Sequence, residues 1–236
     1  MFLNLNYVQA ATDTDGDLLP DEFEELIGTD PTKENSDADK FSDYKEVMRG
    51  YDPITNSKKK LSKSLFTQDT DNDGLTDLEE ITIGTNKENS DSDNDGYQDG
   101  KEILNGFDPL SGDTQQKERY IHVSIATQTL EYKSGDYTVA RFKISTGVSG
   151  YDTPVGTYGI LKKIPVVNYI GKGYSYPNTK WNLRFKPGVN GNFYIHGAFW
   201  HDDFGKKKSH GCVNVAYPQM ERLYNFATEG MRVTIE

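Results

Sequence analysis

Residues 69–80 read DTDNDGLTDLEE, and this stretch decides how the first half of the chain folds. Acidic side chains occupy its positions 1, 3, 5, 9 and 12, and Gly74 at position 6 permits a sharp turn. Ca²⁺ takes about six to eight oxygen ligands, and alternate residues of a tight loop can all point inward, joined by the backbone carbonyl of position 7. The spacing therefore predicts a calcium-binding loop of the EF-hand type.

The same spacing occurs four times. A shift of 56 residues superposes residues 13–53 on residues 69–109, and each copy contains a 22-residue repeat, so units begin at residues 13, 35, 69 and 91. Gly96 repeats the glycine of position 6, whereas Leu18 and Lys40 replace it in the first two units, which makes those two sites weaker candidates. The predicted metal ligands are Asp13, Asp15, Asp17, Leu19, Asp21 and Glu24; Asn35, Asp37, Asp39, Phe41, Asp43 and Glu46; Asp69, Asp71, Asp73, Leu75, Asp77 and Glu80; and Asp91, Asp93, Asp95, Tyr97, Asp99 and Glu102.

Each unit leaves room for one short helix after its loop. Pro20 suits a first helical turn and Gly28 a helix end. Apolar faces are expected from Phe23, Leu26 and Ile27 in the first unit and from Leu78, Ile81 and Ile83 in the third. The pattern over residues 12–110 resembles the thrombospondin type 3 repeats of bacterial exported proteins. A solvated acidic tail is the alternative, but a tail has no need to keep five positions in four copies.

Charge separates the chain into two parts. Residues 1–115 carry a net charge of −18 and residues 116–236 a net charge of +7. The expected organisation is a signal remnant or frayed terminus at 1–11, repeat pairs at 12–53 and 67–110, linkers at 54–66 and 111–118, and a second domain at 119–236. The basic stretch at 55–64 is expected to be a linker, because the acidic surroundings would repel a nucleic acid. No apolar run approaches the roughly 18 residues of a membrane span.

The second half shows short alternating apolar runs. They predict strands near residues 121–125, 139–144, 156–164, 193–195 and 231–235, and one helix over 218–227. We therefore expect a mostly β domain with one clear helix.

Reactive side chains gather late in this half. The chain has one cysteine, Cys212, in the run SHGCVN at residues 209–214, and four histidines, including His196 in Ile195-His196-Gly197. A nucleophilic cysteine needs a nearby imidazole and a third group that orients it. A zinc site built from histidines, aspartates and Cys212 is one alternative, although no usual zinc spacing is present. A buried, inert thiol is another.

Residues 119–236 resemble the YkuD-type L,D-transpeptidase catalytic domain. The resemblance lies in the His-Gly pair, the SHGCVN run, Gln128, Ser145-Thr146-Gly147 and the run TPVGTY at 153–158. The spacer between His196 and Ser209 is slightly short for the family. The resemblance implies a β-sandwich-like domain in which Cys212 attacks a peptidoglycan stem tetrapeptide, D-Ala leaves, and a second stem accepts the acyl group to form a 3→3 cross-link.

The resemblance also implies roles for residues. Cys212 is the expected nucleophile and His196 the expected base, oriented by a carbonyl such as that of Gly197, although which histidine takes the proton stays open. His210 and Ser209 shape the pocket, and the amides of Gly211 and Cys212 are oxyanion-hole candidates. The substrate-binding candidates are Asn214, Gly197, Trp181, Arg184 and Tyr176. Residues 165–187 are expected to form a lid over the cleft, with an ordinary surface loop as the alternative.

The expected function is peptidoglycan cross-linking by a cysteine acyl-enzyme, with structural Ca²⁺ in the repeats and no cofactor for catalysis. An L,D-carboxypeptidase, which uses water as acceptor, and a calcium-dependent wall-binding module without turnover are the alternatives. Stem peptides are the expected partners, and carbapenem β-lactams the expected inhibitors. The lone thiol, the calcium loops and the signal-like start favour a location outside the cytoplasm.

Overall fold

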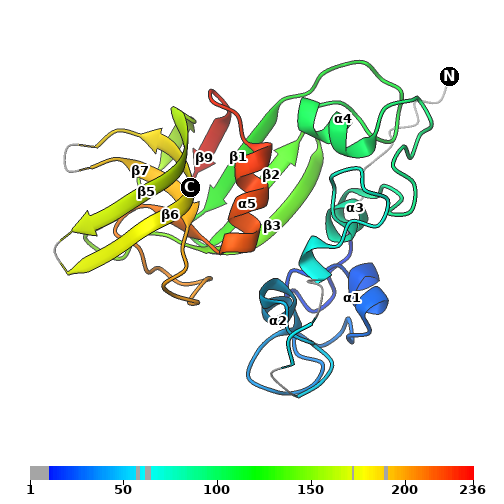
Figure 1. The fold of residues 1–236 in the computed structure, drawn as a ribbon, viewed down its shortest axis with the longest axis horizontal. Coiled ribbons are helices and arrows are strands. Elements are labelled where there is room, and N and C mark those ends of the chain that lie inside the picture. The colour runs from blue at the N-terminus through cyan, green and yellow to red at the C-terminus, as the bar shows by residue number, and fades with distance from the viewer. Residues whose placement is uncertain (1–10, 57–58, 62–64, 172, 189–190) are drawn as a thin grey trace. The chain divides into compact units, whose positions relative to one another are not determined.

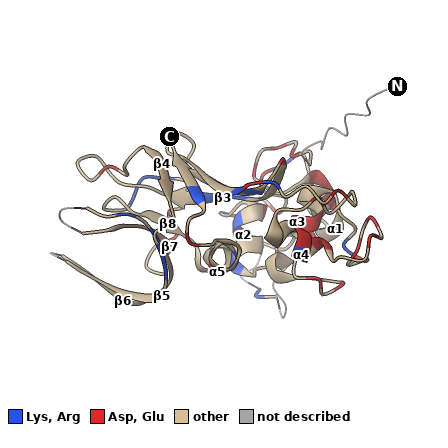
Figure 2. Cartoon of the chain, turned by 90° about the horizontal axis from the view of Figure 1, so that it is seen from above, with Lys and Arg blue, Asp and Glu red and all other residues tan. Residues whose placement is uncertain are grey.

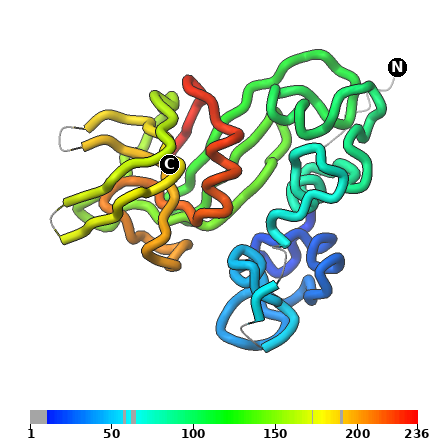
Figure 3. The backbone as a smooth tube through the Cα atoms, viewed as in Figure 1, coloured from blue at the N-terminus to red at the C-terminus, as the bar shows by residue number. Residues whose placement is uncertain are grey.

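The computed structural model describes residues 11–56, 59–61, 65–171, 173–188 and 191–236. The chain divides into two compact units (Figure 1). The first holds the described residues up to Glu118 together with Ser134–Ala140, and the second holds Arg119–Lys133 and Arg141–Glu236. Figure 3 traces the chain through the repeats before the strands begin. The signal-like start, up to residue 10, and residues 57–58 and 62–64 of the expected linker lie outside the described residues.

The described part of the first compact unit carries four short α-helices, each of which begins at position 9 of a predicted loop. These helices are α1 (Asp21–Ile27), α2 (Asp43–Arg49), α3 (Asp77–Ile83) and α4 (Asp99–Asn105), with a 3₁₀ turn, η1 (Leu65–Thr67), between the pairs. Each α-helix ends at a glycine in the left-handed region, namely Gly28, Gly50, Gly84 and Gly106, as a glycine C-cap requires. Phe23 is buried as expected, but Leu26 is 48% exposed, because a seven-residue helix turns only part of its surface to the core.

Position 4 of all four loops, and position 6 of the first, third and fourth loops, lie in the left-handed region of the backbone. Position 6 has φ of 105° at Gly74 and 98° at Gly96, and Leu18 adopts φ of 92° although it is not glycine. A side chain in this region costs about 1–2 kcal/mol. The first loop therefore forms the same turn as the third, at the cost of local strain.

The loops are joined in pairs by one repeated hydrogen bond. The backbone N–H of Tyr44, in α2, donates to Asp17 Oδ2 at 2.8 Å, and that of Gly100, in α4, donates to Asp73 Oδ2 at 2.7 Å. A Cβ on Gly100 would lie 2.5 Å from the carbonyl oxygen of Asp73. The position-5 aspartate of the first loop thus fixes the helix of the second loop, so the structural unit is a pair of loops.

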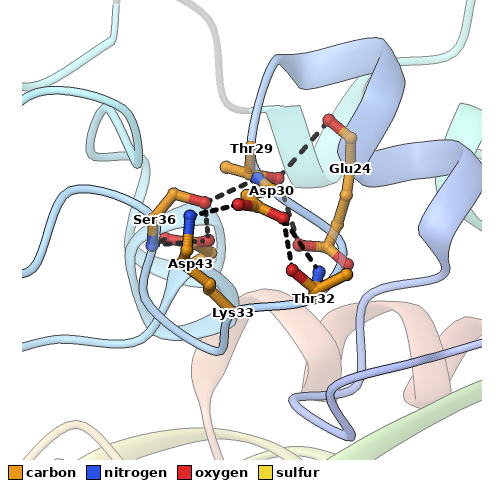
Figure 4. A network of polar contacts seen from close by, with 7 residues as sticks. All are labelled: Glu24, Thr29, Asp30, Thr32, Lys33, Ser36 and Asp43. Atoms are coloured by element: carbon orange, nitrogen blue, oxygen red, sulfur yellow. Dashed lines mark hydrogen bonds and ion pairs between the residues drawn. The ribbon is translucent and has the colours of Figure 1, made fainter.

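A second series of hydrogen bonds links the first loop of each pair to the second (Figure 4). The backbone N–H of Asp30 donates to Ser36 Oγ at 2.6 Å, and the Ser36 hydroxyl donates to Asp43 Oδ2 at 2.7 Å. Thr29 Oγ1 donates to Glu24 Oε1 at the same junction. Asn86, Ser92 and Asp99 repeat the serine relay in the second pair.

The described residues of the second part of the chain form one mixed nine-stranded sheet in the order β4-β9-β1-β2-β3-β8-β7-β6-β5. The strands are β1 (Arg119–Ser124), β2 (Thr129–Ser134), β3 (Tyr137–Ser145), β4 (Gly156–Gly159), β5 (Lys162–Gly171), β6 (Tyr174–Lys186), β7 (Phe193–Gly197), β8 (Val213–Val215) and β9 (Arg232–Ile235). The pairs β1–β9 and β7–β8 are parallel. The expected mostly β class is confirmed, but β2, β6 and β8 did not stand out in the sequence.

The helix α5 (Tyr217–Phe226) packs its apolar side into the core of the second unit. Met220 and Leu223 are fully buried, and the Phe226 ring lies 4.8 Å from that of Tyr132. The run at 156–164 is split, because β4 ends at Gly159 and β5 begins at Lys162. Among the described residues, no helix has both the length and the apolar character needed to cross a bilayer.

We expect Gly100→Ala to destabilise the first unit by about 1–3 kcal/mol, since the added Cβ would overlap the Asp73 carbonyl. Alanine favours a helix over glycine, so helix propensity alone predicts the opposite sign. Unfolding by urea in calcium buffer, followed by circular dichroism, measures the change. Gly112→Ala is the matched control, because its Cβ would meet nothing closer than 3.5 Å. Equal stability of the two variants would contradict the prediction.

Candidate functional site

A cavity of about 1140 Å³ lies within the second unit and contains Cys212. Side chains from the β5–β6 hairpin, from β7 and from the segments at 150–152 and 200–214 line it. His196, Ser209, His210 and Asn214 all share this lining, so the structure brings together most of the residues that the sequence singled out.

The loop before Cys212 is anchored on the end of β3. The Thr146 carbonyl accepts hydrogen bonds from the backbone N–H groups of Lys208 and Ser209 at 2.9 and 3.0 Å. Gln128 holds Thr146 in turn, because its Oε1 accepts from the Thr146 N–H at 2.8 Å and its Nε2 donates to Thr146 Oγ1. A Cβ on Gly147 would lie 1.9 Å from the Tyr151 carbonyl oxygen, so only glycine fits there. These contacts explain in physical terms why Gln128, Thr146 and Gly147 occupy these positions of the sequence.

Ser209 braces the turn that presents the thiol. Its Oγ donates to the Cys212 carbonyl and accepts from the Gly211 N–H at 3.1 Å. Gly211 has φ of 108°, which favours glycine. The Gly211 amide, expected as an oxyanion donor, is therefore already engaged inside the loop.

His196 is buried, with 3% of its surface exposed, and its Nδ1 lies 2.9 Å from the Gly197 carbonyl oxygen. A carbonyl only accepts hydrogen bonds, so Nδ1 carries the proton and Nε2 keeps a free lone pair in the neutral ring. Burial lowers the pKa of His196 to about 4, and the contact with Gly197 opposes this shift. The imidazole is therefore neutral at neutral pH.

The Cys212 thiol is neutral as well. Although part of the residue is accessible, burial of the thiol raises its pKa to about 11, and a hydrogen bond with the Tyr194 backbone acts in the opposite direction. The sequence led us to expect an imidazole that holds the cysteine as thiolate. Burial favours instead a resting pair of thiol and neutral imidazole, in which the proton moves only as the sulfur reacts.

Aromatic rings form much of the cavity wall. The Tyr176 and Trp200 rings stack at 3.8 Å with an angle of 6° between their planes, and Tyr174 stacks on His210 at 5.1 Å. Tyr169 stacks on His196 at 4.5 Å. Tyr169 and Trp200 were not singled out in the sequence, and no spacing signal marks them. The expected lid at 165–187 is most of the β5–β6 hairpin, whose tyrosines supply this wall.

Three residues expected to bind substrate are not among the residues that line the cavity. Trp181 meets the Tyr217 ring edge-on at 5.0 Å, and a Cβ on Gly197 would overlap that same ring. Arg184 pairs within the sheet, where its carbonyl accepts from the Leu161 N–H. Asn214 does line the cavity, and its amide lies 3.0 Å from His201 Nε2.

The four loops gather carboxylates, several of which keep one buried oxygen without a hydrogen bond. The groups are Asp13, Asp15 and Asp17; Asp37, Asp39 and Glu46; Asp69, Asp71 and Asp73; and Asp91, Asp93 and Asp95. All four position-12 glutamates are buried, and each keeps at least one oxygen without a hydrogen bond, as do Asp15, Asp37, Asp71 and Asp93 at position 3. Figure 2 shows acidic residues over the repeats. Buried hard oxygens without donors suit a calcium ion.

The position-9 aspartates make different contacts. Both oxygens of Asp77 accept from Thr70, one from its N–H and one from its hydroxyl, and Asp21, Asp43 and Asp99 do the same with the residue at position 2 of their own loops. Asp21, Asp43, Asp77 and Asp99 are thus placed as braces that close the loop rather than within the carboxylate groups.

Burial and neighbouring aspartates raise the pKa of the position-12 glutamates. The pKa rises to about 8 at Glu24, Glu80 and Glu102, and to about 7 at Glu46. A group of carboxylates that resists ionisation needs protons or a cation, so the loops are electrostatically incomplete without one.

Comparison with protein families gives two matches. The family model of the L,D-transpeptidase catalytic domain matches residues 118–235. The model of the bacterial TSP3 repeat matches residues 13–34, 69–86 and 91–112, which leaves the loop that begins at residue 35 unmatched. No curated protein matches the chain.

Solved structures are similar to the second half of the chain. They include an L,D-transpeptidase from Mycobacterium tuberculosis H37Rv (24% identity, 51% of this chain and 58% of that chain, TM-score 0.46). Another is an L,D-transpeptidase from Mycobacterium smegmatis (23% identity, 51% of this chain and 59% of that chain, TM-score 0.46). A third is L,D-transpeptidase 3 from Mycobacterium tuberculosis with a faropenem-derived adduct (21% identity, 51% of this chain and 60% of that chain, TM-score 0.46). The chain spans about three fifths of the length of these proteins.

We expect alkylation of Cys212 by iodoacetamide to accelerate about tenfold per pH unit through pH 9–10, because the pKa of the thiol is raised to about 11. A small thiol of ordinary pKa, about 8.5, levels off earlier and serves as the reference. The rate constants come from intact-mass measurements over time. A plateau at or below pH 7 would show a resting thiolate and contradict the neutral pair.

Proposed function

We propose that this chain, which belongs to the L,D-transpeptidase catalytic domain family, cross-links peptidoglycan stem peptides through a cysteine acyl-enzyme at Cys212. The observation that carries the proposal is the shared cavity of Cys212 and His196, in which the imidazole has its Nδ1 committed to the Gly197 carbonyl and its Nε2 free. A thiol and an oriented neutral base that line the same cavity supply the groups that acyl transfer requires.

In the first step, the Cys212 proton moves to His196 Nε2 as the sulfur attacks the carbonyl of the peptide bond between an L-diamino acid and D-Ala. The carbon–nitrogen bond breaks, D-Ala leaves with the proton from His196, and a thioester remains on Cys212. The Gly197 carbonyl stabilises the imidazolium through Nδ1. The Cys212 amide is the candidate donor to the oxyanion, since the Gly211 amide is occupied by Ser209.

In the second step, a side-chain amine of another stem peptide attacks the thioester. Nε2 of His196 takes a proton from the amine, the carbon–sulfur bond breaks, and the proton returns to the sulfur. The product is a 3→3 cross-link. The aromatic wall around Tyr176 and Trp200 offers flat apolar surface to the peptide chains that approach the thiol.

We further propose that Ca²⁺ is bound at the four loops. The ligands would be the carboxylates of positions 1, 3, 5 and 12, or Asn35 at position 1 of the second loop, with the carbonyls of Leu19, Phe41, Leu75 and Tyr97 at position 7. The unpartnered buried oxygens support this assignment. Bound cations would offset the negative charge and let the short helices pack. Because weak calcium sites fill at extracellular concentrations, we place the protein outside the cytoplasm.

We expect a carbapenem to acylate the wild type, with an added mass that is absent from Cys212→Ala. Tetrapeptide muropeptides should yield cross-linked dimers, and His196→Gln should slow their formation by at least about 100-fold, because general base catalysis typically contributes that much. Mass spectrometry of the adduct and chromatography of the muropeptides measure both. Tripeptides without dimers would indicate a carboxypeptidase instead. An adduct that survives Cys212→Ala would overturn the assignment of the nucleophile.

We expect calcium chelation at pH 8 to lower the melting temperature of the repeats, as followed by circular dichroism with and without EDTA. In EDTA the melting temperature should rise as pH falls toward 5.5. The reason is that the folded pKa of Glu24, Glu80 and Glu102, about 8, exceeds the unfolded value, so the folded state binds more protons. That stabilisation is lost as pH rises through the folded pKa. Coincident melts with calcium and with EDTA at pH 8 would refute calcium binding.

A further inference from the structure

We infer that Tyr169, itself held by Asn182, is a positioning residue that fixes the plane of the His196 imidazole. Tyr169 lies in β5 and lines the cavity, and its ring stacks on that of His196 with 4.5 Å between centroids and 27° between planes. The inference rests on the proposed function only insofar as His196 acts as the base.

The Tyr169 hydroxyl is directed at Asn182 and not at the reaction. It donates to Asn182 Oδ1 at 2.8 Å, and burial, with the negative charge of a Cys212 thiolate as a smaller cause, raises the pKa of Tyr169. A hydroxyl that already donates its proton to a buried amide is not available to protonate a substrate. The contribution of Tyr169 is therefore its ring face.

Asn182 is an anchor whose side chain joins β5 to β6 and whose backbone lies opposite His196 on β7. It is fully buried in β6, where its Nδ2 donates to the carbonyls of Thr179 at 2.9 Å and Ile164 at 3.1 Å. In the sheet register Asn182 lies opposite Ile164 on β5 and opposite His196 on β7. Every polar atom of its amide thus has a partner, so the position of the Tyr169 hydroxyl is fixed relative to the strand of His196.

An irregularity in β5 occurs beside Tyr169. The β5–β6 register shifts between Val167 and Tyr169. A bulge of this kind changes the direction in which the following side chains point. Tyr169 follows this irregularity, and its ring lies against the His196 ring of β7.

One hydrogen bond cannot orient an imidazole fully. The contact between His196 Nδ1 and the Gly197 carbonyl holds one nitrogen, but the ring could still tilt about that contact. The Tyr169 face removes this freedom, because tilting would drive one ring into the other. Together the two contacts aim Nε2, and misplacement of a catalytic group by about 1 Å can cost about 100-fold in rate.

The test compares Tyr169→Leu, which removes the ring, with Tyr169→Phe, which keeps the ring and removes the hydroxyl. We expect Tyr169→Leu to slow carbapenem acylation of Cys212 by about 100-fold and Tyr169→Phe by less than about tenfold. Nitrogen-15 NMR of the histidine rings should show Nδ1 protonated at His196 in all three proteins, because the contact with Gly197 persists, and an Nε2 resonance broadened by ring tilting in Tyr169→Leu only. Tyr158→Leu is the matched control, because its ring contacts Phe185 and Tyr158 is not among the cavity-lining residues.

Two results would overturn the inference. One is a Tyr169→Leu variant that keeps the wild-type rate. The other is a variant that loses the rate while the His196 ring nitrogens stay unchanged, which would mean that Tyr169 contacts the substrate itself. If the wild type forms no adduct, the proposed function fails, and the NMR comparison alone still decides whether Tyr169 positions His196.

Discussion

The hydrogen bond between His196 Nδ1 and the Gly197 carbonyl constrains the rest of the catalytic half. It sets the tautomer of a buried imidazole, and the surrounding strands bring the Cys212 thiol into the same cavity. The parallel pairing of β7 and β8 places Asn214 opposite His196, two residues after Cys212. The anchoring of the preceding loop on Thr146 and the brace at Ser209 then leave the thiol little freedom. Hydrogen bonds to the backbone therefore hold both the His196 ring and the loop that carries Cys212.

In both halves of the chain, burial favours the neutral form of titratable side chains, because the charged form loses more hydration free energy on leaving water. In the catalytic half, burial moves the pKa values of His196 and Cys212 apart and leaves both groups neutral. In the repeats, burial raises the pKa of clustered carboxylates that cannot all remain neutral at physiological pH. In the proposed function, proton transfer between Cys212 and His196 resolves the first case, and a bound cation resolves the second. Desolvation is the common physical cause, and the number of like charges decides which solution applies.

The sequence predicted what depends on local spacing. The four loops, their glycine-terminated helices and the grouping of Cys212 with His196, His210 and Asn214 followed from short motifs. It did not predict Tyr169 or Trp200, because an aromatic residue on a strand looks the same whether it fills a core or lines a cavity. Trp181 and Arg184 were expected to bind substrate, and neither is among the residues that line the cavity, because the sequence of a strand does not show which of its side chains face a cavity. The hydrogen bond from the Gly211 amide to Ser209 Oγ also leaves no trace in a motif, so nothing in the sequence indicated that this oxyanion-donor candidate has a partner inside the loop.

The paired loops have a consequence for how such a segment can change in length. Because Asp17 and Asp73 each hold the amide of a helix that belongs to the next loop, deleting one loop of a pair would strand a buried carboxylate oxygen. Deleting or duplicating a whole pair breaks no such contact. Viable insertions and deletions in this region should therefore come in steps of 56 residues rather than 22. The length of the repeat region would then change between related chains by whole pairs of loops.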